Sequence, residues 1–315
     1  MTEQNSKRHQ LEQWTQVVAD TGDLAAIEQC RPVDATTNPS LMLAAAQADD
    51  GEKRLSEARH LAAQLGQKND IALLCDAFAT LTGKHILSLV PGLVSTEVDA
   101  RLSFNTRATL ERARRIISLY RELGIERERI LIKIAATWEG IRAAEVLEEE
   151  GIACNLTLLF SHEQAMAAAE AGATLISPFV GRIYDWYKKQ GMVIDTPEQD
   201  PGVISVRNIF NTYRAQGFST IVMGASFRYP AQIEALAGCD KLTISPALLA
   251  QLDNDKSPLT RALDAADVVT EDNTPAITEQ AFRWALNDNP MANDLLSDGI
   301  RRFARDQEAL EKLLA

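Results

Sequence analysis

The most informative stretch of the chain is an apolar run, ILIKIA at residues 130–135, that is interrupted by one lysine. A short run of β-branched and aliphatic residues is typical of a buried parallel strand. Because side chains alternate along a strand, Lys133 lies on the face opposite to the three isoleucines of the run. The pattern therefore predicts that the Lys133 ammonium points into the space that this second face encloses.

Apolar runs of this kind recur along the chain, and each is followed by a segment with helical periodicity. The predicted strands begin near Val17, Ala35, Leu87, Leu131, Asn155, Leu175, Ile221 and Leu242. Eight β/α units in 315 residues predict an α/β fold, a closed (β/α)8 TIM barrel, in preference to an open doubly wound sheet. The third strand is assigned to HILSLVPG at residues 85–92, so that Glu97 follows it.

Helix signals divide the same pattern. Pro39 directly after Asn38 is typical of a first helical turn with an asparagine cap. Residues 40–84 are largely helical in pattern and rich in alanine, and the tail from about residue 275 is helical too. No linker composition precedes that tail. We therefore expect a single domain over residues 1–315, a barrel with extra helices and with the C-terminal helices packed on it.

Composition narrows the classes of partner. Hydrophobic residues make up 46% of the chain, which is ample for a sizeable core. A formal net charge of -12 argues against a nucleic-acid partner, which needs a basic face, but an anionic small substrate stays open if a few arginines converge. The first residues carry no apolar signal core and no apolar run is long enough to span a membrane. We expect no membrane partner and a cytoplasmic location.

The cysteines and histidines give no sign of a bound metal. The four cysteines lie far apart without a C-x-x-C pair, and the four histidines have no metal-binding spacing. Buried free thiols are the expected state. The sequence predicts neither a disulfide framework nor a metal site, and we expect no cofactor.

A lysine held away from water has a chemical use. Desolvation favours the neutral amine, which can attack a carbonyl carbon and form a Schiff base. The alternative is an edge-strand lysine whose ammonium reaches solvent. Buried lysines are rare unless they are paired or used, so the functional interpretation of Lys133 is favoured.

In a (β/α)8 barrel, functional residues collect at the C-terminal ends of the strands. In addition to Lys133, the side chains at or just past these ends are those of Asp20, Asn38, Glu97, Asn155, Thr157, Ser177, Phe179, Arg182 and Arg228. Asn38 could instead be only a helix cap, and Thr157 an ordinary strand residue. Asp20 and Glu97 could be solvated loop carboxylates. The convergence of so many polar residues on one rim favours a site.

Two long stretches now make the chain recognisable: DATTNPSLM at residues 34–42 and ILIKIAATWEGI at residues 130–141. They resemble the two signature stretches of the class I transaldolases. NLTLLFS, ISPFVGR, DWYK and VMGASFR extend the resemblance in family order over essentially the whole chain, with no departure at a motif position. The resemblance implies sugar phosphate substrates and a homodimer.

The resemblance also implies a role for each residue of the rim. Lys133 would be the Schiff-base lysine, and Asp20 and Glu97 would be the acid/base carboxylates. Thr157 would hold a water through which protons are relayed. The substrate would be held by Asn38, Asn155, Ser177, Phe179, Arg182 and Arg228, of which Ser177 and the two arginines would take the phosphate.

The implied activity is that of a transaldolase of the pentose phosphate pathway. Such an enzyme moves a dihydroxyacetone unit from sedoheptulose 7-phosphate to glyceraldehyde 3-phosphate and gives erythrose 4-phosphate and fructose 6-phosphate. A class I aldolase that releases free dihydroxyacetone is one alternative. A barrel that binds sugar phosphates without forming a covalent adduct is another, from a different class of protein. The two arginines could also pair with rim carboxylates instead of binding phosphate.

Overall fold

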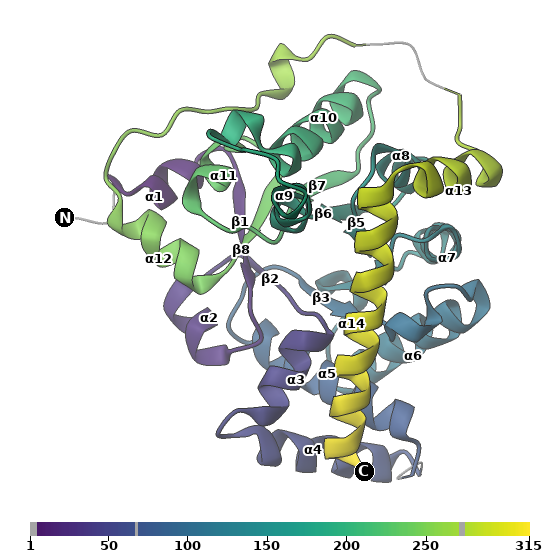
Figure 1. Cartoon of the computed structure of the whole chain (residues 1–315). Helices are drawn as coiled ribbons and strands as arrows, with labels where there is room; N and C mark the ends of the chain where they lie inside the picture. The colour runs from purple at the N-terminus through teal and green to yellow at the C-terminus, as the bar shows by residue number, and fades with distance from the viewer. Residues whose placement is uncertain (1–4, 67–68, 271–274) are drawn as a thin grey trace.

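The strands of this protein close into a parallel barrel in sequential order, β1 to β8 (Figure 1). The computed structural model describes residues 5–66, 69–270 and 275–315. The strands are β1 Gln16–Asp20, β2 Asp34–Thr36, β3 Val94–Glu97, β4 Ile130–Ala135, β5 Cys154–Leu159, β6 Leu175–Pro178, β7 Ile221–Gly224 and β8 Lys241–Ile244. The predicted (β/α)8 barrel is thereby confirmed. Residues 1–4, part of the stretch read for a signal sequence, lie outside the described residues.

Helices follow the strands and surround the barrel (Figure 1). They are α1 Lys7–Leu11, α2 Leu24–Cys30, α3 Pro39–Gln47, α4 Gly51–Gln64, α5 Ile71–Leu87, α6 Thr106–Glu122, α7 Trp138–Glu149, α8 His162–Glu170, α9 Val180–Lys189, α10 Pro201–Ala215, α11 Pro230–Glu234, α12 Pro246–Asn254, α13 Glu279–Asp288 and α14 Pro290–Leu314. Short 3-10 turns are η2 Ala100–Leu102, η3 Arg127–Arg129, η4 Pro197–Gln199 and η5 Ala265–Asp267. The helical interpretation of residues 40–84 and of the tail is confirmed.

The predicted position of the third strand is wrong. The first residues of the run at 85–92 complete α5, and β3 is the later segment Val94–Glu97. A short apolar run can be the buried end of a helix or a buried strand, so periodicity alone could not assign residues 85–92 to one of the two. β3 itself has only four residues, three of them polar, and it lacks the apolar signature. Glu97 is therefore the last residue of a strand, in register with Lys133 on β4.

β4 has the predicted alternation. Its three isoleucines pack in the main core between the sheet and the helices. Leu131 lies on the other face and packs inside the barrel with Val18, Leu175 and Met223. Lys133 shares that inner face two residues nearer the C-terminal end of the strand and is only 5% exposed.

The long C-terminal helix α14 packs along one side of the barrel (yellow in Figure 1). It contacts α3, α5, α9 and β5, so the end of the chain meets the middle of the chain. A Cβ atom at Gly299 would lie 2.6 Å from the side chain of Leu158, which means that glycine lets α14 approach β5 closely. Through this packing, α14 brings Phe303 to the C-terminal ends of the strands.

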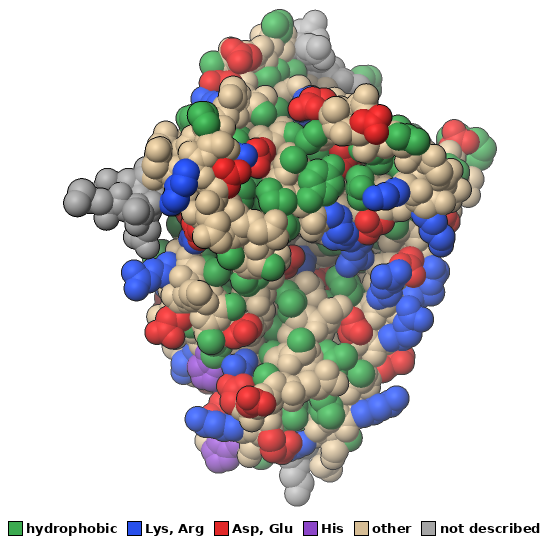
Figure 2. All heavy atoms as spheres, turned by 60° about the vertical axis from the view of Figure 1, so that its left-hand side comes forward, with side chains coloured by type: hydrophobic (Ala, Val, Ile, Leu, Met, Phe, Trp, Pro, Cys, Tyr) green, Lys and Arg blue, Asp and Glu red, His purple; other side chains and the backbone are tan. Residues whose placement is uncertain are grey.

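The surface carries both signs of charge. Acidic and basic side chains are interspersed over the face in Figure 2, and basic ones gather toward its right-hand edge. An anionic small molecule could therefore find local positive potential despite the net charge of -12. Within the described ranges, no helix is long and apolar enough to cross a membrane. The four cysteines are free thiols; Cys30 is partly exposed, and the other three are buried.

Candidate active site

Lys133 lies in the C-terminal half of β4, which pairs with β3 on one side and with β5 on the other. Its Nζ donates a hydrogen bond of 3.0 Å to the backbone carbonyl of Thr37. The same atom lies 3.2 Å from Oε2 of Glu97. The alternative of an edge-strand lysine that reaches solvent is wrong, since a closed barrel has no edge and the side chain is buried.

Glu97 is the ionic partner of Lys133. Its side chain is 3% exposed, so the alternative of a solvated loop carboxylate is wrong for this residue. Oε2 makes the ion pair but has no aligned hydrogen bond in the described structure. Burial raises the pKa of the Glu97 carboxyl, and the nearby charge of Lys133 opposes that rise only in part.

Asp20 ends β1 and faces the same space. Burial of its carboxyl group raises the pKa of Asp20, while Lys133 and, more weakly, Arg182 pull it down. The hydroxyl of Thr36, its register neighbour on β2, lies 3.5 Å from Oδ1 of Asp20. Asp20 as a whole is partly exposed, but its pKa is raised, as expected for a carboxyl group that has little contact with water.

A narrow cavity of about 60 Å³ opens above Lys133. Its wall contains six of the ten predicted site residues and several that were not predicted. It is lined by Asp20, Thr36, Asn38, Lys133, Ser177, Phe179, Arg182, Met223, Ala225, Ser226, Thr243 and Phe303. The structure therefore brings a nucleophile, a carboxyl group and an arginine together around one small space.

Asn38 is a helix cap, as considered for it, and it also lies at the cavity wall. Its Oδ1 accepts a hydrogen bond of 3.0 Å from the backbone N–H of Leu41, which makes it the N-cap of α3 with Pro39 in the first turn. It also lines the cavity above Lys133. Capping fixes the side chain, so its amide group is held in place at the cavity wall.

Asn155 and Ser177 form a chain of hydrogen bonds beside the lysine. The Ser177 hydroxyl donates to Oδ1 of Asn155 at 2.6 Å, and Nδ2 of Asn155 donates to Ser95 at 3.0 Å. The Ser177 hydroxyl is thus engaged by Asn155, and its phosphate contact stays a prediction. Thr157 is fully buried on β5, and its hydroxyl has no hydrogen-bond partner among the described residues.

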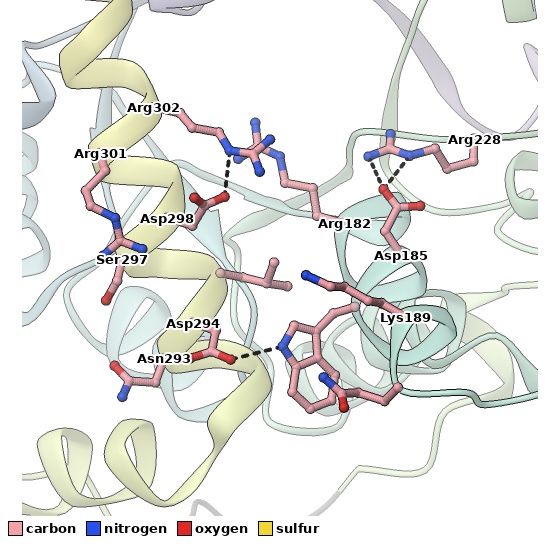
Figure 3. A pocket seen from close by; sticks show the side chains of 13 residues that line it. Arg182, Asp185, Lys189, Arg228, Asn293, Asp294, Ser297, Asp298, Arg301 and Arg302 are labelled. Atoms are coloured by element: carbon pink, nitrogen blue, oxygen red, sulfur yellow. Dashed lines mark hydrogen bonds and ion pairs between the residues drawn. The ribbon is translucent and has the colours of Figure 1, made fainter.

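Next to the cavity lies a wider pocket of about 560 Å³ between α9 and α14, and Arg182 lines both (Figure 3). Its guanidinium lies over the ring of Phe179, 4.6 Å from the ring centroid, and 5.5 Å from the centroid of Phe303. Burial and then the charges of Arg302 and Arg228 lower the pKa of Arg182. Like charges gathered in this way make a site for an anion.

Three other arginines line this pocket, Arg228, Arg301 and Arg302, and two of them are paired. Nη2 of Arg228 lies 2.8 Å from Asp185, and Nε of Arg302 lies 2.6 Å from Asp298, as the dashed lines in Figure 3 mark. The alternative of a rim carboxylate partner thus holds for Arg228 in this state. For Arg182 no such pair occurs in the described part of the chain.

Backbone geometry holds Arg228 close to α9. A Cβ atom at Gly181 would lie 2.1 Å from the carbonyl oxygen of Ser226, so only glycine fits at this position. The Gly181 N–H donates to that same carbonyl at 2.8 Å. Ser226 itself has a φ of 63°, which is unusual for a residue other than glycine. This strained turn sets the direction in which Arg228 leaves β7.

Several residues at the site were not predicted from the sequence. Thr36 and Thr243 hydrogen-bond to each other at 3.0 Å in the cavity wall, and alternation on their strands could have indicated them. Ser226 follows β7 within a recognised stretch. Phe303 and Arg302 come from α14, and no strand-end signal points to a distant helix. Among the described residues no cluster of three or more His, Cys, Asp or Glu side chains is arranged to hold a metal.

Known proteins resemble this chain over nearly its whole length. The family model described as transaldolase/fructose-6-phosphate aldolase matches residues 17–314. A curated transaldolase of Marinobacter nauticus is 56% identical over 310 residues, which cover 98% of this chain and 97% of that protein. A curated transaldolase of Agrobacterium fabrum is 54% identical over 311 residues, again 98% and 97%. The matched range contains every residue of the candidate site.

Proposed function

The chain belongs to the transaldolase/fructose-6-phosphate aldolase family, and from this we propose that it is a transaldolase whose nucleophile is Lys133. The observation that carries the proposal is the position of Lys133. It is buried on the inner face of the barrel, 3.2 Å from a carboxylate, at the wall of a cavity that also holds Asp20 and Asn38. A primary amine in such a place is suited to attack a carbonyl carbon.

The two carboxyl groups divide the proton transfers. Glu97, in contact with Lys133 Nζ, accepts the ammonium proton so that the amine can attack the ketose carbonyl. Loss of water from the adduct gives an iminium ion, which withdraws electrons from the adjacent carbon–carbon bond. Asp20 then takes the proton of the C4 hydroxyl as the C3–C4 bond breaks and the aldose leaves. Burial raises the pKa of each carboxyl group, so each takes up a proton more readily than an exposed carboxyl group does.

The second half of the reaction uses the same groups in reverse. The three-carbon unit remains on Lys133 as an enamine and attacks the aldehyde carbon of the acceptor. Asp20 returns its proton to the new hydroxyl group. Water then hydrolyses the iminium, and we propose that Thr157 holds this water near Glu97. The proposal is supported by the Thr157 hydroxyl, which is fully buried and has no hydrogen-bond partner among the described residues.

Substrate recognition follows from the sizes of the two spaces. A cavity of about 60 Å³ is narrow and accepts the reacting carbons, whereas the neighbouring pocket of about 560 Å³ has room for a phosphate group. We propose that Arg182 and Arg228 bind this phosphate and that Phe179 forms an apolar wall. Asn38, Asn155 and Ser177 would hold the hydroxyl groups of the substrate and of the covalent intermediate, with Ser177 reaching the phosphate after it leaves Asn155.

Several finer points are part of the same proposal. The donor would be sedoheptulose 7-phosphate and the acceptor glyceraldehyde 3-phosphate, within the pentose phosphate pathway and in the cytoplasm. The active form would be a homodimer. Residues 1–315 would act as one domain, which is supported by the contacts of α14 with α3, α5, α9 and β5. No metal or other cofactor takes part in the proposed steps.

Borohydride trapping tests the proposal. We expect fructose 6-phosphate followed by borohydride to leave a reduced three-carbon adduct on the peptide that contains Lys133. Peptides with Lys241, the other buried barrel lysine, and with the exposed Lys189 serve as internal controls and should stay unmodified. Lys133→Ala should abolish both the adduct and transfer, because alanine has no amine.

The same experiment separates the alternatives. Continuous release of free dihydroxyacetone without an acceptor would indicate an aldolase. Tight binding of fructose 6-phosphate with no adduct would indicate a binding protein. An adduct that persists in Lys133→Ala would exclude Lys133 as the nucleophile.

A further inference from the structure

A second, smaller cavity lies behind Glu97, on the side away from the substrate cavity. Its volume is about 20 Å³, and α14 closes it with Gln307 and Leu310. Its polar lining comes from Thr37, Asn38, Asp76, Glu97, Asp99, Arg112 and Gln307. Asn38 lines both cavities, so the two spaces share one wall. Because Lys133 lines only the first and Glu97 only the second, the Lys133–Glu97 ion pair forms part of that wall.

Most polar groups of this second cavity are already paired. Asp76 accepts hydrogen bonds from Arg112 at 3.0 Å and from Arg115 at 2.7 Å. Asp99 holds Arg101 through both of its carboxylate oxygens. These pairs fix the walls and leave no free charge to balance Glu97 from behind.

Gln307 is different from its neighbours. It is 9% exposed, no hydrogen bond of its side-chain amide occurs within the described part of the chain, and the amide is not one of the fully buried groups without a partner. Oε2 of Glu97 lies 3.2 Å from Nζ of Lys133 in the shared wall and has no further partner among the described residues. Glu97 and Gln307 therefore line one small space, and each has hydrogen-bonding capacity that the described residues do not fill. A buried polar group without a partner is costly, so such an arrangement calls for something between them.

The size of the cavity decides what fits. About 10–15 Å³ of such volume is enough for one water molecule with two or more polar partners. The space of about 20 Å³ accepts one water and nothing larger. A water here can donate to Glu97 and accept from the Gln307 amide.

We propose that Gln307 is a positioning residue of the reaction, which holds a water against Glu97 on the side away from the substrate. This inference rests on the proposed function of Glu97 as the proton acceptor of Lys133. The water orients the carboxylate toward Lys133 and stabilises its ionised form. It also lets Glu97 exchange a proton from the side away from the substrate.

Two substitutions of Gln307 test the inference. In Gln307→Leu, the amide is lost and the water with it, so kcat should fall about tenfold, the usual size for one hydrogen bond to a charged group. The KM for fructose 6-phosphate should stay within about twofold, since Gln307 does not touch the substrate. Loss of the water also raises the pKa of Glu97, and the acid limb of the pH–rate profile should move to higher pH.

Gln307→Glu is the second variant. It puts a carboxylate behind Glu97, where the charged groups that face the cavity are Asp76, Asp99 and Arg112, with Lys133 across the wall. The added negative charge should move the acid limb to higher pH as well. Met42→Leu is the matched control, because Met42 lines the same cavity and leucine changes its shape without changing a polar group. This control should keep kcat and the pH profile.

The outcomes separate this inference from the proposed function. Unchanged kcat and pH profiles in both Gln307 variants, in an enzyme that still forms the borohydride adduct, would overturn the inference alone. An equal loss in Met42→Leu would overturn it too, since it would indicate a packing effect. If Gln307→Leu does not fold, an unshifted acid limb in a folded Gln307→Glu is decisive against it. Absence of any adduct in the unchanged enzyme would overturn the proposed function itself.

Discussion

At the scale of single residues, two carboxyl groups lie at different distances from the Nζ atom of Lys133. Glu97 contacts Lys133 Nζ directly at 3.2 Å, while Asp20 acts on it across the cavity. Burial raises the pKa of both carboxyl groups. Glu97 can therefore accept a proton at a pH at which an exposed glutamate would stay ionised, and Asp20 can do so later for the substrate hydroxyl.

This division predicts that Asp20→Asn separates the steps. The amide cannot accept the C4 hydroxyl proton, so carbon–carbon cleavage should slow by about 10²–10⁴-fold, the range for loss of general acid–base catalysis. Lys133 should still form its imine, because that step uses Glu97. Single-turnover cleavage and borohydride trapping measure the two steps. Asp23→Asn, three residues along in the N-cap of α2 and outside the cavity above Lys133, is the control. Cleavage at the parent rate in Asp20→Asn would remove Asp20 from the mechanism.

The same substitution should stabilise the fold, in a way that depends on pH. Because the pKa of Asp20 is raised in the native state, the native protein binds more protons than the unfolded chain above the ordinary aspartate range. Native stability therefore falls as pH rises through that window. Asp20→Asn avoids this cost, so its free energy of unfolding in urea should exceed that of the parent at pH 8. The difference should vanish below about pH 4, where the aspartate is protonated in both states. A constant difference at both pH values would contradict the argument.

Single-residue placement could be predicted where strand alternation or a strand end applied. Lys133 and Asp20 were found in this way, and the structure gives both the expected orientation. The contact of Lys133 with the carbonyl of Thr37 was not predictable, since it depends on how the β2–α3 turn crosses the barrel. Phe303 was missed because a helix 170 residues from Lys133 carries it.

At the scale of elements, the barrel has a second buried lysine at its other end. Lys241 begins β8 and lies 2.6 Å from Asp34, which begins β2, and both side chains are under one tenth exposed. Asp34 also accepts from Gln16 at 2.6 Å and from the backbone N–H of Leu93 at 2.8 Å. One carboxylate thus ties together β1, β2, β8 and the start of β3. A burial pattern cannot tell this lysine from Lys133; only the end of the strand on which each lies does so.

Removing this ion pair should affect stability and not chemistry. Lys241→Met leaves Asp34 buried without its cation, which should cost about 3–5 kcal/mol in the free energy of unfolding. The lower end of the range is expected, because Gln16 and Leu93 still bind the carboxylate. The double variant Asp34→Asn/Lys241→Met should recover part of the loss. Urea unfolding measures stability, and kcat of the folded fraction should stay unchanged. A fall in kcat without a loss of stability would give Lys241 a part in the reaction instead.

Helices and strands could be predicted where a regular apolar pattern extended over many residues or where capping residues marked the ends of a helix. The signal failed at β3, where the strand is short and polar and the apolar run before it belongs to α5. β5 contains an irregularity that no sequence pattern indicated. Its register with β6 shifts between Leu156 and Leu159, and Leu158 has a φ of 52°. That bulge directs Leu158 toward Gly299, so the irregular strand and α14 fit each other.

At the scale of the whole molecule, the pocket proposed to bind phosphate is assembled from three distant parts of the chain. α9 supplies Arg182, the turn after β7 supplies Arg228, and α14 supplies Arg301 and Arg302 (Figure 3). In a chain with a net charge of -12, this pocket concentrates positive charge at one place. Arg228 and Arg302 each form an ion pair with a carboxylate. The Arg182 guanidinium instead lies over the rings of Phe179 and Phe303, where it can bind an anion without first losing a carboxylate partner.

This difference predicts unequal effects for the two arginines of the phosphate clamp. A charge-assisted bond is worth roughly 1.5–3 kcal/mol, so Arg182→Ala should lower kcat/KM for fructose 6-phosphate by about one to two decades. Arg228→Ala should cost less, because phosphate must displace Asp185 before it gains Arg228. By the same argument Asp185→Asn, which frees Arg228, should raise kcat/KM for the phosphorylated sugar. Fructose, without a phosphate, should be nearly indifferent to all three changes, and Arg305→Ala, on α14 but outside the pocket, should affect neither sugar. Equal proportional losses for fructose and fructose 6-phosphate in both arginine variants would rule out the clamp.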